Sequence, residues 1–389
     1  MNLGFDMQAV QSVNSIGGIG VYNRSLLGRM LELYPENRYE LFFNGLYDIR
    51  DQPFVKSANT RIHAVQYLRG NDLNPLNKLI QYAAYRSRPL DLLHILSPFE
   101  PQSHAVISNR AGSKTVVTAY DFIPFIFKDL YLGSPLQMKL YSDRVSILRS
   151  ASLVLSISEA TRRDAIELMG LSPDKVVNVG IAPSNEFRKL DASMSAIITG
   201  IREKHGIQGP FVLTVSNLDH RKNLATLLRA FSSLPDFILR EFSLIVVCNS
   251  NPEYVKRDKR VSEWLGRDRP RVTLLYFIPV DELVALYNAC HLFVYASLYE
   301  GGGLPIVEAM KCGAPVVASN TSSIPEYVGR ADALFDPKDQ ASITESMQRV
   351  LTDDVLRREL ACYGEEHSRS FSWDGVVNRA MQAYEQVAG

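Results

Sequence analysis

Two carboxylates and a run of glycines lie close together in the segment EGGGLPIVE, residues 300–308. Glu300 comes first, Gly301 to Gly303 follow, and Glu308 stands eight positions after Glu300. Glycines let a backbone approach a ligand closely, and free N–H groups at a helix start bind phosphate or sugar oxygens. The segment therefore predicts a site for a sugar or phosphate ligand. The alternative is that Glu308 is only a first-turn acid, which the helix dipole favours.

Two cations, Arg221 and Lys222, follow an apolar run at 211–216 and precede a helix expected from about residue 223. Positive charge at the start of a helix opposes the helix dipole, so this placement favours an anion docked beside it. A diphosphate would interact with both cations and with the free N–H groups of the helix. The alternative is a basic turn that is simply solvated.

The elements that must position these residues follow a regular pattern, because strand-like runs alternate with helix-like runs along the chain. This alternation is typical of a doubly wound α/β fold. A strand expected at 292–297 ends just before Glu300, Pro305 suits a first helical turn, and Gly313 predicts the end of that helix. Open α/β sheets bind ligands at the carboxyl ends of their strands, where Glu300 is expected.

A second glycine-rich segment, NSIGGIG, lies between a strand expected at 2–10 and a helix expected from residue 21. Gly17, Gly18 and Gly20 would let this loop pack against a diphosphate or an acceptor. The alternative is a tight turn whose glycines need positive φ.

Length and composition narrow the class of protein. The chain has 389 residues, which suggests two or three domains, and 42 basic against 42 acidic side chains, which gives no nucleic-acid footprint. Its four cysteines show no metal-binding spacing, so we expect reduced, mostly buried thiols. The polar amino terminus and the absence of an ~18-residue apolar run predict a soluble, cytoplasmic protein.

The segment EGGGLPIVEAMKCGAPVVASNTSSIPE, 300–326, resembles the E-x7-E signature of the retaining glycosyltransferases of family four (glycosyl transferases group 1). The similarity extends over most of the chain. It implies a GT-B fold, in which two Rossmann-like, doubly wound domains face each other across a cleft. We place the acceptor-binding domain at 1–185, completed by a last helix at about 374–389, and the donor-binding domain at 186–373.

The resemblance also implies roles for individual residues. Glu300 would contact the donor sugar, Arg221 and Lys222 the donor diphosphate, and Glu308 the ribose hydroxyls. The catalytic set is therefore Glu300, Arg221 and Lys222. The remaining substrate-binding candidates are Gly302, Gly303 and Leu304 through their amides, Gly17, Gly18 and Gly20 in the first loop, and Tyr120, Asp121, Asn217, Asn249, Phe277 and Ile278 near strand ends.

Two residues depart from the family pattern. Tyr120 replaces a histidine that lies near the donor sugar in the family, and it either hydrogen-bonds a sugar hydroxyl or only packs. Gly302 replaces an aromatic residue, which changes how the sugar would be held. Asn217 stands where some members have an arginine, so Arg221 and Lys222 must supply the positive charge.

The predicted function is transfer of a hexose, with retention of configuration, from a UDP-glucose or GDP-mannose type of donor to a glycan or lipid-linked glycan acceptor in polysaccharide biosynthesis. No D-x-D triplet occurs, so we expect no metal and no other cofactor. The alternatives are a nucleotide-sugar epimerase of the same fold and a catalytically idle nucleotide-sugar-binding subunit. Expected partners are donor and acceptor, without nucleic acid and with at most peripheral contact at the inner membrane face; the sequence predicts no oligomeric state.

Overall fold

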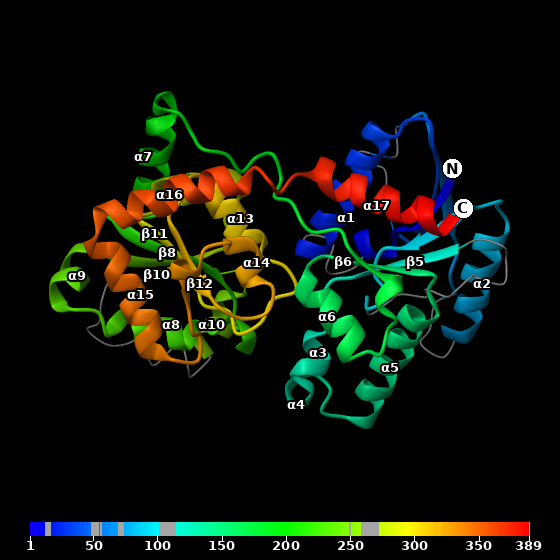
Figure 1. Cartoon of the computed structure of the whole chain (residues 1–389), viewed down its shortest axis with the longest axis horizontal. Coiled ribbons are helices and arrows are strands. Elements are labelled where there is room, and N and C mark those ends of the chain that lie inside the picture. Colours follow the sequence, from blue (N-terminus) through cyan, green and yellow to red (C-terminus); the bar gives the residue numbers. More distant parts are fainter. Residues whose placement is uncertain are drawn as a thin grey trace. The chain divides into compact units, whose positions relative to one another are not determined.

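The computed structural model describes residues 1–11, 17–47, 54, 57–68, 74–100, 114–248, 250–257 and 272–388. The chain divides into two compact units (Figure 1). The amino-terminal unit comprises Met1–Ile181 together with Ser372–Gly389, and the carboxyl-terminal unit comprises Ala182–Phe371.

The amino-terminal unit contains a seven-stranded sheet in which every pair of neighbours is parallel, in the order β3-β2-β1-β4-β5-β6-β7. Short apolar runs form the central strands, which are buried on both faces, as parallel sheets covered by helices require, whereas the edge strand β3 is largely half-buried or exposed. The strands are β1 Asn2–Asp6, β2 Arg38–Asn44, β3 Thr60–Val65, β4 Leu92–Ile95, β5 Lys114–Ala119, β6 Leu153–Ser156 and β7 Val176–Asn178.

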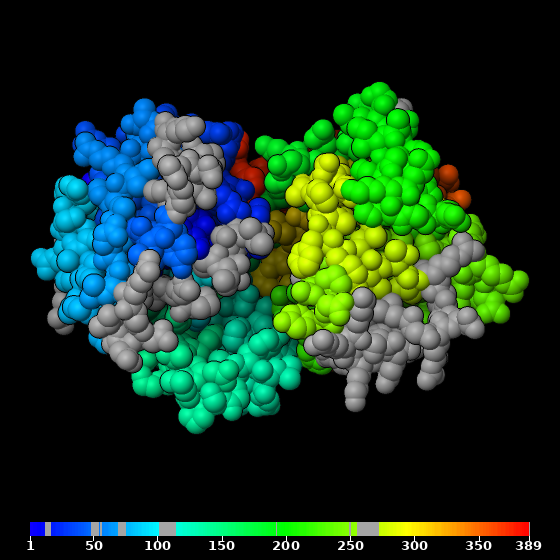
Figure 2. Space-filling model, turned by 180° about the vertical axis from the view of Figure 1, so that it is seen from behind, coloured from blue at the N-terminus to red at the C-terminus, as the bar shows by residue number. Residues whose placement is uncertain are grey.

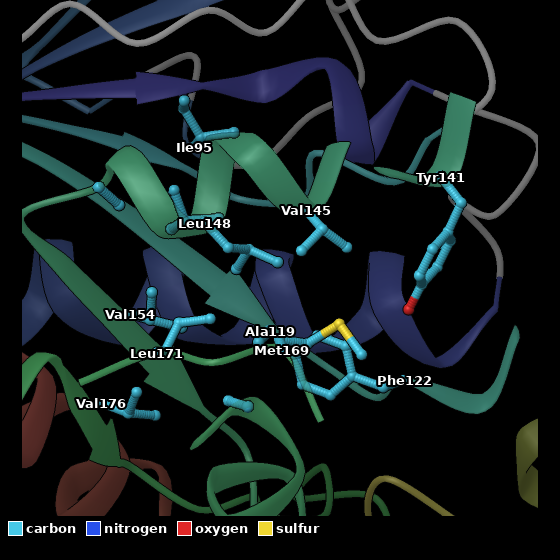
Figure 3. Close-up of a cluster of buried hydrophobic side chains, with 13 residues drawn as sticks. Ile95, Ala119, Phe122, Tyr141, Val145, Leu148, Val154, Met169, Leu171 and Val176 are labelled. Atoms are coloured by element: carbon cyan, nitrogen blue, oxygen red, sulfur yellow. The ribbon is translucent and has the colours of Figure 1, made fainter. Parts of the chain in front are cut away.

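The helices of this unit pack on that sheet, and Figure 3 shows a core cluster formed by Ile95, Val145, Leu148, Val154 and other apolar side chains. The unit includes the last helix of the chain, whose Tyr384 hydroxyl lies 2.7 Å from Nδ1 of His94. The helices are η1 Met7–Val10, α1 Gly18–Leu33, α2 Asn74–Arg86, α3 Ile123–Ile126, α4 Lys128–Tyr131, α5 Pro135–Ser150, α6 Glu159–Glu167, η5 Pro173–Lys175 and α17 Trp373–Ala388.

The carboxyl-terminal unit has a six-stranded parallel sheet in the order β10-β9-β8-β11-β12-β13. The strand order reverses between β8 and β11, which makes this pair the topological switch point, where such sheets bind ligands. The strands are β8 Phe211–Ser216, β9 Ser243–Cys248, β10 Val272–Tyr276, β11 Leu292–Tyr295, β12 Val316–Ser319 and β13 Leu334–Phe335.

Several helices of the carboxyl-terminal unit have identifiable end signals, such as the aspartate N-caps of α15 and α16. Gly313, with φ of 80°, follows α13 and confirms the predicted helix end. The helices are η6 Ala192–Met194, α7 Ser195–Lys204, η7 His220–Lys222, α8 Leu224–Ser232, α9 Asp236–Glu241, α10 Pro252–Arg257, α12 Val280–Ala289, α13 Leu304–Lys311, α14 Ile324–Val328, η8 Ala331–Ala333, α15 Gln340–Thr352 and α16 Asp354–Ser368.

A second buried glutamate of this unit, Glu282, has two basic partners away from the switch point. In the space-filling view the green residues of α7 lie beside the yellow residues of α12 (Figure 2). Lys204 Nζ on α7 is 2.5 Å from Oε1 of Glu282 on α12, and His205 Nε2 is 2.5 Å from the other carboxylate oxygen.

The first glycine-rich segment differs from its prediction. The helix begins at Gly18, so Gly18 and Gly20 lie in its first turn, and Gly17 is its N-cap with φ of −85°. None of these three glycines is among the positive-φ residues of the described chain, so the alternative of a positive-φ turn is wrong. Gly lowers helix propensity, which is why the sequence favoured a loop here.

Three of the four cysteines are buried and all four are free thiols, which confirms the prediction of mostly buried, reduced cysteines. Within the described ranges, no helix is both long enough and apolar enough to cross a membrane.

Candidate functional site

Three charged side chains meet at the switch point of the carboxyl-terminal sheet. Oε2 of Glu300 is 2.7 Å from Nη1 of Arg221, and Oε1 of Glu300 is 2.7 Å from Nζ of Lys222. The side chains of Arg221 and Lys222 are 19% and 14% exposed, so the alternative of a solvated basic turn is wrong. The anion that these cations required is provided in this structure by Glu300.

The loop after β8 carries Arg221 and Lys222 and is bonded directly to the segment after β11. Asn223 takes a left-handed conformation with φ of 55°, and its Nδ2 donates to the carbonyl oxygens of Ala296 (3.1 Å) and Pro337 (2.8 Å). The N–H of Leu298 donates to the carbonyl oxygen of Arg221. These backbone contacts fix the two cations relative to the strand that leads to Glu300.

The phenol of Tyr295, the last residue of β11, completes the charged cluster. Its hydroxyl donates to Oε1 of Glu300 over 2.9 Å and lies 2.8 Å from Nζ of Lys222. The Lys222 ammonium also lies 5.1 Å from the centre of the Tyr295 ring. The sequence analysis did not identify Tyr295 as a site residue, because it lies in an apolar strand. Its position as the last residue of that strand, where ligands bind, could have indicated a role for its hydroxyl group.

The segment 319–326 holds the backbone of Glu300 from the other side. Oγ of Ser322 accepts from the N–H of Glu300 over 2.9 Å, and Oγ of Ser323 donates to the carbonyl oxygen of Glu300 over 2.9 Å. Thr321 Oγ1 donates to the carbonyl oxygen of Leu298. The hydroxyl-rich segment downstream of the glycine run therefore fixes the loop that presents the carboxylate.

Backbone strain gathers at the same edge of this sheet. In the part of the chain that the structure describes, the non-glycine residues with positive φ are Asn223, Phe277 and Ser322. They follow β8, β10 and β12, so all three lie in loops at the carboxyl ends of the strands. Such strain costs of order 1–3 kcal/mol per residue and tends to cluster at functional sites.

The glycine run ends at the start of α13, where Pro305 lies in the first turn as predicted. Gly303 is the N-cap residue of α13. Glycine has no side chain that could accept hydrogen bonds from the N–H groups of the first turn. A Cβ on Gly303 would lie 2.7 Å from Cδ2 of Tyr327, so only glycine fits. Gly302 and Leu304 flank this position.

Glu308 lies in the second turn of α13, and no acidic residue lies in the first turn, so the alternative of a first-turn acid is wrong. The Tyr287 hydroxyl approaches Oε2 of Glu308 at 3.4 Å. Burial raises the pKa of Glu308 to about 7, and the hydrogen bond from Tyr287 opposes this rise.

The pKa of Glu300 is shifted downward, in the opposite direction to the pKa of Glu308. Burial alone would raise the pKa of Glu300, but Lys222 and then Arg221 outweigh burial and lower that pKa below its usual range. Burial lowers the pKa of Lys222, Glu300 opposes that change, and Arg221 reinforces it. Glu300 is thus a carboxylate at neutral pH, held by two cations.

The remaining predicted residues of the carboxyl-terminal unit lie in loops after its strands. Asn217 Oδ1 accepts from the N–H of Asp219 and so shapes the loop that carries Arg221. Phe277 is 61% exposed, whereas Ile278 is half-buried. Asn249 lies outside the described residues.

The amino-terminal unit contains Gly17, Gly18, Gly20, Tyr120 and Asp121. Tyr120 is buried, its hydroxyl donates to Oδ1 of Asn23, and its ring packs edge-on against Tyr22. This environment favours the packing alternative for Tyr120. Asp121 Oδ1 accepts from the N–H of Ile123 at the start of α3.

No group of three or more His, Cys, Asp or Glu side chains in the described ranges is arranged to hold a metal ion. The polar groups that converge at the switch point are instead two cations, the phenol of Tyr295 and two carboxylates, Glu300 and Asp219, the latter 3.5 Å from Nε of Arg221. This set can bind an anionic ligand that also carries hydroxyl groups.

Two family models match this chain. Residues 198–367 match "Glycosyl transferases group 1", and residues 17–181 match "Glycosyl transferase 4-like domain".

The chain is 29% identical over 405 residues to the serotype-specific mannosyltransferase WbdA of Escherichia coli, covering 100% of this chain and 48% of WbdA. It is 32% identical over 237 residues to the O-antigen chain mannosyltransferase B of Escherichia coli, covering 61% of each chain. The chain spans about half the length of the WbdA relatives that it matches.

Among solved structures, that of Anabaena Alr3699/HepE in complex with UDP and glucose is similar, with a TM-score of 0.75 and 19% identity. The similarity covers 99% of this chain and 100% of that chain. A likeness at this identity shows the fold, and with the two parallel sheets it confirms the predicted GT-B class of two Rossmann-like units.

Proposed function

This chain belongs to the glycosyl transferases group 1 family, and we propose that it transfers a hexosyl group from a nucleoside diphosphate sugar to a hydroxyl group of a glycan acceptor in polysaccharide biosynthesis. The carboxyl-terminal unit binds the donor, and the amino-terminal unit binds the acceptor.

One observation carries this proposal: Arg221, Lys222 and Glu300 meet at the switch point beside the uncapped start of α13. Two mostly buried cations and a helix start suit a diphosphate. A carboxylate that remains ionised in their midst suits the hydroxyl groups of a sugar. Glu308, further along α13, suits the ribose.

In the proposed reaction the acceptor hydroxyl oxygen forms a bond to the anomeric carbon as the bond from that carbon to the phosphate oxygen breaks. The leaving phosphate takes the proton of the acceptor hydroxyl, and the nucleoside diphosphate departs. Attack on the face that the leaving group vacates retains the anomeric configuration. Arg221 and Lys222 stabilise the charge that develops on the phosphate, so the reaction requires no metal.

The names of the two relatives described above indicate which hexose to propose for this chain. WbdA and the O-antigen chain enzyme are mannosyltransferases, and the first matches this chain over its full length. We therefore propose mannose as the transferred hexose and GDP-mannose as its donor, ahead of UDP-glucose. The acceptor is a glycan or a lipid-linked glycan.

The test is a transfer assay with GDP-mannose or UDP-glucose, a mannose-terminated oligosaccharide as acceptor, and EDTA throughout. We expect transfer from GDP-mannose, with a product whose anomeric NMR signals show retention. A product of inverted configuration would contradict the retaining mechanism, and full dependence on added divalent metal would contradict metal independence.

A parallel reaction without acceptor separates the alternatives. An epimerase would convert the donor freely, whereas a transferase hydrolyses it only slowly. Binding without any turnover, over a panel of acceptors, would favour the idle binding subunit.

Glu308 gives the proposed donor site a specific pH dependence. Above a pKa of about 7 it is a carboxylate, which accepts hydrogen bonds from both ribose hydroxyls. We expect wild-type affinity for GDP to rise between about pH 6 and pH 8. In Glu308→Gln affinity should be about tenfold lower at pH 8 and nearly independent of pH. Calorimetric titration at several pH values measures both.

The pH dependence of thermal stability provides a control for the raised pKa of Glu308. A folded-state pKa of about 7, above the usual value of 4.5 for glutamate, means that the folded protein holds a proton that the unfolded chain releases. Stability from the protonated form is fully present below about pH 4.5 and is lost as pH rises through 7. The melting temperature of Glu308→Gln relative to wild type should therefore increase from pH 5 to pH 8; a constant difference would contradict the assignment.

A further inference from the structure

Tyr295 is a buried polar residue that the proposed reaction does not use. Its hydroxyl, Nζ of Lys222 and Oε1 of Glu300 form a closed triangle with sides of 2.7, 2.8 and 2.9 Å. The Tyr295 side chain is 1% exposed, and its ring stacks on Phe293 at 6.1 Å between centroids. The hydroxyl is therefore held in place by a rigid strand.

The protons in this triangle can be assigned one by one. The phenol has a single proton, which it donates to Glu300, so its oxygen lone pairs face Lys222. Burial and the neighbouring Glu300 raise the pKa of Tyr295 well above its usual value, so it remains protonated. Lys222 has three protons and uses two of them, on Tyr295 and Glu300. No third acceptor for this ammonium group is found among the described side chains and carbonyls.

We propose that Tyr295 is a positioning residue: its hydroxyl fixes the Lys222 ammonium against Glu300 and so reserves the third N–H of Lys222 for an oxygen of the leaving phosphate. This assignment rests on the proposed function. Without the hydroxyl, Lys222 would retain Glu300 as its single fixed partner, and rotation about the last bond of its side chain would spread the remaining protons over other directions.

The Tyr295 hydroxyl also influences the pKa of Lys222. The charged groups that face Lys222 are Glu300, Arg221 and Asp219, and all three remain when Tyr295 is replaced by phenylalanine. That replacement removes the oxygen that accepts from the ammonium, together with the hydrogen bond that the phenol donates to Glu300. The pKa of Lys222, already lowered by burial, should then fall further.

The test is Tyr295→Phe, which keeps the ring and its stacking. We expect kcat to fall about tenfold with KM changed less than about twofold, because Lys222 binds most tightly as charge develops on the leaving group. The basic limb of the pH profile of kcat/KM should move about one unit lower. An unchanged kcat, or a fall in kcat without movement of that limb, would overturn the assignment.

The matched control is Tyr39→Phe. Tyr39 is 0% exposed, and its hydroxyl donates to the carbonyl oxygens of Met30 and Tyr34 in the amino-terminal unit. This variant loses a buried phenol hydroxyl and a similar amount of stability without touching the charged cluster. It should leave both kcat and the basic limb in place.

Titration with GDP between pH 7 and pH 10 separates this inference from the proposed function. GDP binding should weaken at high pH as Lys222 loses its proton, and about one pH unit earlier in Tyr295→Phe. If this shift appears while no donor is turned over, the positioning role stands and the proposed function fails. If turnover is normal and the two pH curves coincide, the positioning role is overturned; if the wild type does not bind nucleotide at all, both proposals are overturned.

Discussion

Replacing Lys222 with methionine is expected to lower kcat/KM for the donor by about a thousandfold. Methionine fills the space of the lysine stem but removes the ammonium, which lies 2.7 Å from Glu300 and 2.8 Å from the Tyr295 hydroxyl. Removing one preorganised hydrogen-bond donor that stabilises developing negative charge typically lowers the rate by a factor of about 10²–10³. Because Lys222→Met also removes a full positive charge, we expect a factor near the upper end of that range. Initial rates with GDP-mannose over a range of concentrations measure the effect.

The control for this variant is Lys204→Met. Lys204 also forms an ion pair with a buried glutamate, since its Nζ is 2.5 Å from Oε1 of Glu282. This pair joins α7 to α12 and lies away from the switch point. The change in net charge is the same, so the two variants separate a local contact from a general electrostatic effect. Equal losses in the two variants would contradict the role of Lys222.

Glu300→Gln is expected to produce opposite effects on turnover and on nucleotide binding. The amide removes the nearest anion of Arg221 and Lys222, whose side chains are only 19% and 14% exposed, and leaves Arg221 the longer ion pair with Asp219 at 3.5 Å. Breaking a buried ion pair typically destabilises a protein by about 3–5 kcal/mol, and the partial exposure places this case at about 3 kcal/mol. Turnover should fall more than a hundredfold, because the carboxylate that we propose contacts the donor sugar is lost.

Free GDP should nevertheless bind Glu300→Gln about tenfold more tightly than wild type, because its diphosphate supplies the missing anion without competing with a carboxylate. GDP should accordingly raise the melting temperature of this variant more than that of wild type. Glu282→Gln, which leaves Lys204 and His205 without their partner, should show no such gain. Weaker GDP binding in Glu300→Gln would show that Glu300 does not compete with the diphosphate as a counter-ion of Arg221 and Lys222.

The sequence predicts the elements of the carboxyl-terminal site well and its internal pairing poorly. Buried apolar runs, Pro305 and Gly313 placed Glu300 after a strand and beside a helix start, as the structure has them. The bonds from Glu300 to Arg221 and Lys222 were not predicted, because they depend on β8 and β11 being neighbours in the sheet. Strand order is not visible in local residue patterns.

Other differences have local causes. The sequence predicts a loop at Gly17, Gly18 and Gly20, yet α1 starts among them, because the packing of the helix outweighs the weak helix propensity of glycine. For Glu308 a first-turn acid was the alternative to a ligand site, and residue spacing gives no measure of the burial that raises its pKa. For Tyr120, the edge-on contact with Tyr22 and the bond to Asn23 involve α1, a partner about a hundred residues away in sequence.

The most direct test of the donor site is calorimetric titration of GDP, UDP and ADP, each with EDTA, into wild type, Lys222→Met and Lys204→Met. We predict that one nucleotide, GDP, binds wild type and Lys204→Met equally, and that Lys222→Met loses at least about tenfold in affinity. Equal binding to all three proteins, or binding that disappears with EDTA, would contradict a metal-free donor site built on Arg221, Lys222 and Glu300.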